Sequence, residues 1–195
     1  MKSFSLILIW SIFAFMLFVG GKADKPCKLP SKWKSNFYDR DDKAKLRSSI
    51  ELFYDAENKQ MRRIGYQKEG DNEDNLDTLL FFNEKIKYTY SFSTKKCEKS
   101  IIDFDWVDFD IPKNALYNGD QILGLTGSGL VATTWTAQVD MEGQKFQYVS
   151  LFTKTNCVPI TVYLDNEKHN YQAFFLNVTV NAFDSDAFKI RTECL

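Results

Sequence analysis

Apolar and polar residues alternate with a period of two along much of the chain beyond its first two dozen positions. Isoleucine, tyrosine and phenylalanine alternate with lysine, threonine and serine over residues 86–92. The same pattern recurs over residues 146–152, 158–164 and 174–180. This period is typical of β-strands that bury one face, so the chain is predicted to be rich in strands.

Short polar segments separate the alternating runs, as expected for hairpin turns. They lie at residues 55–58, 83–84, 140–143 and 165–168. Such connections indicate antiparallel hairpins and meanders, and roughly nine to eleven strands are predicted. The fold is therefore predicted to be all-β, as a sandwich or a curved half-barrel, with one short helical turn at residues 184–189.

Residues 1–21 have the pattern of a secretory signal peptide. Lys2 provides a basic start, residues 4–19 are almost wholly apolar, and glycine and alanine follow. A membrane-spanning helix needs about 20 apolar residues, so an uncleaved anchor is the less favoured alternative. We predict cleavage after Gly21 or after Ala23 and secretion of the remaining chain.

Residues 24–195 are predicted to form a single β domain, because no linker-like segment or internal repeat divides them. The 25 basic residues nearly balance the 26 acidic ones. A neutral balance provides no electrostatic footprint for nucleic acid and no polybasic membrane patch. No nucleic-acid partner is therefore expected.

Four cysteines follow the predicted signal peptide, and they are expected to form disulfides in an oxidising compartment. Their wide spacing lacks the CxxC pattern of zinc or redox sites. Four cysteines allow three pairings, and the spacing does not choose among them. The cysteines are Cys27, Cys97, Cys157 and Cys194.

Residues with catalytic potential are sparse. The single histidine, His169, lies in a polar turn, and a serine hydrolase would depend on it. Ser128 has threonine at position 126, where the G-x-S-x-G motif needs its first glycine. The glycine-bearing loop 124–129 lacks the lysine and glycine order of a phosphate-binding loop. We therefore expect a protein that is not an enzyme.

Two acidic segments are weak candidates for calcium ligands, because clustered carboxylates suit this cation outside the cell. Neither segment has the EF-hand order, and a solvated strand face explains alternating acids equally well. No other cofactor is expected. The candidates are Asp71, Glu73, Asp74, Asp103 and Asp105.

Asn177 begins an N-glycosylation sequon, Asn-Val-Thr. Alternation over this segment predicts that Leu176, Val178 and Val180 face inward. Asn177 and Thr179 would then face outward, where a glycan has room.

The chain is dense in aromatic residues, with 17 phenylalanines, 9 tyrosines and 4 tryptophans. These rings either form a solid core or partly line an open cavity for an apolar ligand, as in other secreted β folds. The alternation and the aromatic content indicate seven candidate residues that would line such a cavity. They are Tyr54, Tyr88, Phe92, Trp135, Phe152, Phe174 and Leu176.

Several motifs occur in the order found in the ependymin-related proteins, and the mature chain resembles that family along its whole length. They surround the cysteines, a tryptophan and a D-I-P element, and the sequon and Cys194 complete the series. The segments are residues 26–33, 53–55, 61–64, 93–97, 106, 110–112 and 156–160.

The resemblance implies two stacked antiparallel sheets that form an open half-barrel with a hydrophobic pocket, in the manner of bacterial lipoprotein carriers. It implies the bridges Cys27–Cys157 and Cys97–Cys194. It further implies a secreted glycoprotein, in some relatives a lysosomal one, that forms homodimers and is linked to calcium, cell–matrix adhesion and lipids or gangliosides.

These inferences predict a secreted noncatalytic glycoprotein that binds a lipid or another amphiphile in a pocket between the sheets. The alternative is a calcium-dependent protein of cell–matrix adhesion that acts through its outer surface on the extracellular matrix. A solid core would favour the alternative.

Overall fold

The computed structural model describes residues 25–106, 108–141, 143–181, 183 and 185–195. The predicted signal peptide, both cleavage positions and Asp184 of the predicted helical turn lie outside the described residues.

Eleven antiparallel strands make up one continuous sheet, in the order β6-β5-β4-β3-β2-β1-β11-β10-β9-β8-β7. The chain meanders outward from β1 to β6, crosses to the other edge, and meanders back from β7 to β11. The strands are β1 (Lys32–Asp41), β2 (Leu46–Asp55), β3 (Gln60–Glu69), β4 (Asn72–Phe81), β5 (Ile86–Ser91), β6 (Cys97–Ile101), β7 (Leu116–Leu123), β8 (Leu130–Met141), β9 (Gln144–Thr153), β10 (Pro159–Asp165) and β11 (Asn170–Val180).

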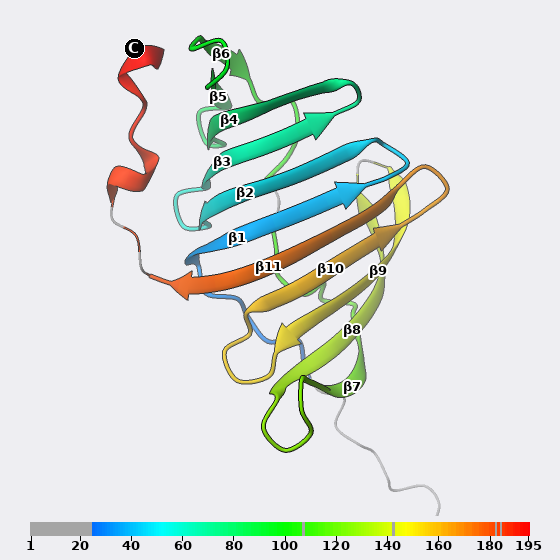
Figure 1. Ribbon diagram of the computed structural model, residues 1–195. Helices are drawn as coiled ribbons and strands as arrows, with labels where there is room; N and C mark the ends of the chain where they lie inside the picture. The colour runs from blue at the N-terminus through cyan, green and yellow to red at the C-terminus, as the bar shows by residue number, and fades with distance from the viewer. Residues whose placement is uncertain (1–24, 107, 142, 182, 184) are drawn as a thin grey trace, which may run out of the picture.

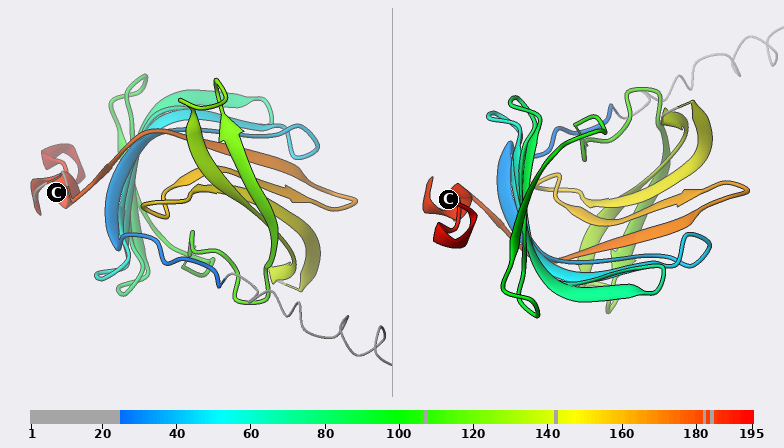
Figure 2. Two further views of the ribbon diagram at one scale, coloured as in Figure 1. Left: turned by 90° about the horizontal axis from the view of Figure 1, so that it is seen from below. Right: turned by 90° about the horizontal axis from the view of Figure 1, so that it is seen from above.

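The sheet curls into an open half-barrel with a concave and a convex face (Figures 1 and 2). Strands β2–β6 form one wall and β7–β9 form the other, with β1, β11 and β10 between them. The predicted all-β half-barrel is confirmed. Its two walls are one hydrogen-bonded sheet instead of two separate stacked sheets, because the first and last strands pair at the centre.

The hydrophobic core lies on the concave face. Inward positions of β1 and β2 carry Trp33, Phe37 and Tyr54, all buried, as the alternation within these strands requires. Residues 102–106 and 108–115, from the connection between β6 and β7, lie across this face and contribute buried side chains to the same core. We call residues 102–106 and 108–115 the crossing segment.

The C-terminal segment packs against the convex face of β3–β5 (Figure 1). It contains two short 3-10 helices, Ser185–Phe188 and Thr192–Cys194. The first lies within the predicted helical turn. Arg62 of β3 donates to the carbonyl oxygen of Ala187 (2.8 Å) and forms an ion pair with Asp77 of β4 (2.6 Å).

Two disulfides close the fold, Cys27–Cys157 and Cys97–Cys194. These are the pairs that the family resemblance implied. The first ties the N-terminal segment to the turn between β9 and β10, and the second ties the start of β6 to the C-terminal segment. Among the described helices, none has the length and apolar content that crossing a membrane requires.

Candidate functional site

The seven predicted lining residues do not share one face of the sheet. Three of them are buried in the concave-face core: Tyr54, Trp135 and Phe152. The other four belong to the convex face by strand register, and several are well exposed: Tyr88, Phe92, Phe174 and Leu176. The structure therefore does not assemble the pocket that alternation alone suggested.

The predicted direction of Leu176 is wrong, and a β-bulge explains the error. The register of β11 against β1 shifts between Lys34 and Asn36. Phe175 faces the core with 3% of its surface exposed, whereas Leu176 faces outward with 50% exposed. Asn177 is exposed, as predicted, but it occupies the irregular position with φ of 53°.

The crossing segment covers the aromatic part of the concave face. Trp106 stacks on Tyr54 with ring centroids 4.9 Å apart, and Phe109 meets Trp33 edge to face at 5.6 Å. Burial raises the pKa of Tyr54 far above its ordinary value, and Asp108 adds to that effect. This part of the face is solid core, because the chain supplies its own rings to fill it.

A cluster of polar groups lies beyond the covered part, at inward positions of β1–β3 and β11. Asp39 accepts hydrogen bonds from the hydroxyl groups of Ser48 and Tyr171, the latter at 3.2 Å, and Arg63 lies 4.0 Å from it. Burial, together with the charge of Asp39, raises the pKa of Tyr171 well above 10.0. Its hydroxyl therefore remains a hydrogen-bond donor. We call Asp39, Asp41, Ser48, Arg63, His169 and Tyr171 the polar cluster.

Asp41 joins the β1–β2 turn to the β10–β11 turn. Its carboxylate accepts from the backbone N–H groups of Ala44 and Asn170, each at 3.1 Å, and contacts His169 Nδ1 at 2.8 Å. Burial alone would raise the pKa of Asp41, but these donors outweigh it and hold that pKa below 3.8. The carboxylate is therefore ionised at neutral pH, and its oxygens already have partners.

Apolar side chains continue the same concave face toward β8. Cross-strand pairing places Asp41 opposite Tyr171, Tyr171 opposite Leu164, Leu164 opposite Tyr148 and Tyr148 opposite Ala137. Leu164 and Ala137 are half-buried, while burial raises the pKa of the Tyr148 phenol to about 12. We call these five residues the amphipathic row, because one end is polar and the other apolar.

Sequence reasoning missed the polar cluster apart from His169, although a signal for it existed. Asp39 and Asp41 occupy the same alternating positions of β1 as Trp33 and Phe37. Charged residues in the apolar register of a strand are unusual, because an ionised group is costly to bury unless it has partners. Such residues therefore point to a hydrogen-bonded network or a binding surface.

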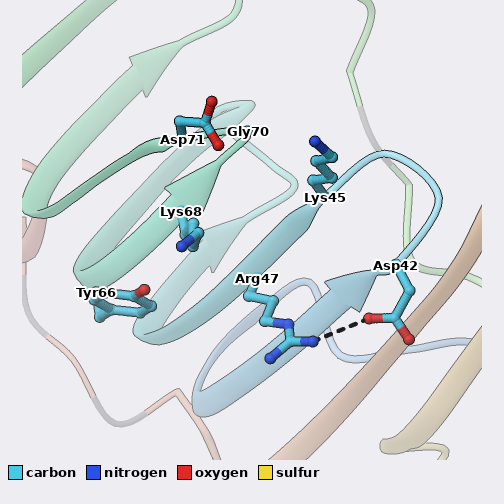
Figure 3. Close-up of a pocket in the computed structure, with 7 residues that line it drawn as sticks. All are labelled: Asp42, Lys45, Arg47, Tyr66, Lys68, Gly70 and Asp71. Carbon is cyan, nitrogen blue, oxygen red and sulfur yellow. Dashed lines mark hydrogen bonds and ion pairs between the residues drawn. The ribbon is translucent and has the colours of Figure 1, made fainter.

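A shallow hollow of about 450 Å³ lies on the convex face near the β1–β2 and β3–β4 turns (Figure 3). Its basic groups largely face acidic partners: Arg47 pairs with Asp42 at 3.3 Å and Lys68 with Glu73 at 3.3 Å. The hydroxyl of Tyr66 also donates to Glu73. The hollow is therefore close to neutral, and we assign it no ligand.

The five calcium candidates are dispersed. Glu73 accepts from Tyr66 and Lys68, and Asp74 accepts from the hydroxyl groups of Ser91 and Ser93. The remaining three are Asp71 beside the β3–β4 turn and the exposed Asp103 and Asp105 of the crossing segment. Within the described part of the chain, no three acidic, histidine or cysteine side chains come close enough to hold a metal ion.

The two residues considered for hydrolysis lie at opposite ends of β8. The His169 ring contacts Phe146, which pairs with Val139 near the end of β8. Ser128 lies in the turn that precedes β8, where its N–H donates to the Leu125 carbonyl oxygen at 3.1 Å. This placement does not combine the two into a nucleophile and base.

The structure is an open β half-barrel with two disulfides and a partly polar concave face. The family model for Ependymin matches residues 70–194, and the chain belongs to the ependymin family. It is 25% identical over 184 residues to Ependymin from Clupea harengus, covering 83% of this chain and 81% of that protein. Membership fits a secreted adhesion or binding protein, and the two disulfides are consistent with the extracellular space.

A solved structure has the same fold at low sequence identity. It is the crystal structure of an uncharacterized conserved protein from Thermus thermophilus, with a TM-score of 0.55 and 12% identity. The match covers 84% of this chain and 86% of that chain. At this identity the likeness supports the fold alone.

Proposed function

We propose that this protein is a secreted, noncatalytic binding protein that holds an amphiphile against the uncovered part of its concave face. The observation that carries the proposal is the amphipathic row, which runs from Asp41 across β11, β10 and β9 to Ala137. A surface that changes from polar to apolar along one line suits a ligand with a head group and a tail.

The polar end of the ligand would meet the Arg63 and His169 side chains of the polar cluster. Both Arg63 and His169 keep about a third of their side-chain surface exposed, at 30% and 34%. The carboxylates of Asp39 and Asp41 are nearly buried and already accept several hydrogen bonds. We therefore expect a head group that accepts hydrogen bonds from the Arg63 guanidinium to be preferred.

The apolar part of the ligand would lie along Leu164 and Ala137 toward Phe146, all of them half-buried. Each aliphatic or aromatic side chain that the ligand fully desolvates contributes roughly 1.5–3 kcal/mol. Micromolar binding requires a net free energy of about −8 kcal/mol after the cost of immobilising the ligand, so two or three such contacts fall short and the polar end must contribute as well.

The test uses mature protein, secreted by a eukaryotic host and stripped of lipid, titrated with a fluorescent long-chain fatty acid. Leu164→Arg places a charge in the amphipathic row and is expected to weaken binding by roughly tenfold or more. Leu176→Arg is the matched control, because Leu176 lies on the convex face with 50% exposed. Failure of the native protein to bind fatty acid or ganglioside would reject the proposal.

Calcium-dependent cell–matrix adhesion is the second candidate function. Its support is the pair of exposed carboxylates on the crossing segment, Asp103 and Asp105. Calorimetric titration with millimolar calcium tests it. Absence of both heat and a thermal shift would remove the metal from this candidate.

A further inference from the structure

The hairpin of β7 and β8 contains the longest uncharged stretch of the chain after residue 24. No lysine, arginine, aspartate or glutamate occurs in residues 121–139. These residues form the end of β7, the turn 124–129 and most of β8. In Figure 1 this turn projects beyond the neighbouring strand ends at the bottom of the sheet.

Apolar side chains occupy both faces of the hairpin tip. Ile122 pairs with Val131, and the adjacent pair is Leu123 with Leu130. Adjacent cross-strand pairs point to opposite faces of a sheet, so each face carries one apolar pair. Leu125 extends the tip further, with 77% of its surface exposed, and Leu130 is 50% exposed.

Polar groups mark the base of this apolar tip. Asp120 forms an ion pair with Lys154 and accepts a hydrogen bond from the Tyr117 hydroxyl at 2.7 Å. Asp120 precedes Leu123 by three positions, which corresponds to about 10 Å of strand. That distance is close to the 5–10 Å to which apolar faces of membrane-bound segments enter the interface between head groups and acyl chains.

We propose that the hairpin tip, residues 122–131, inserts into the surface of a lipid membrane. A protein partner would cover one face of the hairpin, whereas acyl chains surround a protruding tip and solvate both apolar faces. The absence of charge from residues 121–139 removes the main cost of entering the bilayer. Tyr117, Asp120 and Lys154 then lie at the depth of the head groups.

The hairpin tip is separate from the amphipathic row, and neither proposal depends on the other. Tip insertion needs no ligand in the amphipathic row. The titration of native protein and Leu164→Arg with fatty acid is done in solution without a membrane. A negative result in one experiment therefore does not affect the other proposal.

The test is sedimentation of mature protein with phosphatidylcholine vesicles. Leu125→Asp is expected to lower the apparent affinity at least roughly tenfold, because a charge replaces a leucine that the lipid would desolvate. Ile101→Asp is the matched control, since Ile101 is 76% exposed on β6 at the opposite edge of the sheet. That variant is expected to bind like the native protein.

A second experiment detects insertion of the tip directly, without comparing the fractions of protein bound to vesicles. Leu125→Trp is expected to show fluorescence quenching by brominated phosphatidylcholine, and Ile101→Trp is expected to show none beyond the native protein. Equal binding of native protein and Leu125→Asp, or unquenched Leu125→Trp, would overturn the proposal. A further result would also overturn the proposal: native protein that does not bind vesicles, together with a Leu125→Asp variant that is monomeric where the native protein is dimeric. The hairpin tip would then be a contact between two copies of the chain.

Discussion

The ring of Trp106 stacks on the ring of Tyr54, with centroids 4.9 Å apart and planes inclined by 28°. Tyr54 belongs to β2, and Trp106 belongs to the crossing segment that runs from one edge of the sheet to the other. The stack therefore fastens the crossing segment to the concave face. It also explains why the aromatic half of that face is core instead of a ligand pocket.

Trp106→Ala is expected to lower the free energy of unfolding by roughly 2–4 kcal/mol, because it leaves a cavity between Tyr54 and Phe82. Guanidinium denaturation followed by circular dichroism measures the loss. Asp105→Ala, one residue earlier and exposed, is the control and is expected to change stability by less than about 0.5 kcal/mol. Similar losses for both variants would show that the stack does not fasten the crossing segment.

Arg62→Ala is expected to lower the free energy of unfolding by about 3–5 kcal/mol, because it breaks an ion pair of the buried Asp77 carboxylate. The Arg62 and Asp77 side chains are 12% and 2% exposed, and Arg191 adds a second contact to Asp77 at 3.2 Å. Lys189→Ala removes an exposed pair with Asp186 and is expected to cost less than about 1 kcal/mol. Chemical denaturation compares the two variants, and equal small effects would contradict this assignment.

The Asp41 contacts are expected to make stability depend on acid pH. The pKa of Asp41 is lower in the folded protein than its ordinary 3.8, so its stabilising contribution is complete above that value. It is lost as the pH falls through the folded-state pKa. Asp41→Asn is therefore expected to be less stable than native protein at pH 7 and to lose less additional stability between about pH 4 and pH 2.

Thermal unfolding measured across this pH range checks the Asp41 prediction. Asp42→Asn is the control, because Asp42 forms an exposed pair with Arg47. An acid profile of Asp41→Asn that matches the native one would show that Asp41 does not contribute to the pH dependence.

Asn177 is expected to carry an N-linked glycan when the chain is secreted from eukaryotic cells. The side chain is exposed, and the sequon is intact. Asn177→Gln should remove a mass that peptide N-glycosidase also removes from native protein. Asn181→Gln is the control, because Asn181 is exposed with the same φ of 53° but lies outside a sequon. A native mass without carbohydrate would contradict the prediction.

The hairpin turns could be predicted from the local sequence. The polar segment at residues 55–58 forms the β2–β3 turn, where the Asp55 carboxylate accepts from the N–H groups of Glu57 and Asn58. A turn of this kind depends on neighbouring residues alone, so composition and spacing predict it. Face assignment in β11 failed at Leu176, because a bulge depends on the partner strand and leaves no trace in the alternation.

The candidate site was predictable only in part. Tyr54 and Phe152 both face inward, but Tyr54 is covered by Trp106 of the crossing segment, which is distant from it in sequence. The polar cluster combines Asp41 with His169, which are 128 residues apart. Contacts between residues so far apart in sequence depend on the order of the strands in the sheet. Local sequence patterns do not predict that order.

The sequence by itself determined the strand-rich class, the polar turns, the supply of cysteines for two bridges and the family, because each depends on local pattern or on ordered motifs. The tertiary structure decided that the walls are one sheet, that the crossing segment fills the aromatic half of the concave face, and that Asp39, Asp41, Arg63 and Tyr171 meet beside it. The physical reason is that alternation specifies two faces of each strand but does not specify which segment packs on either face.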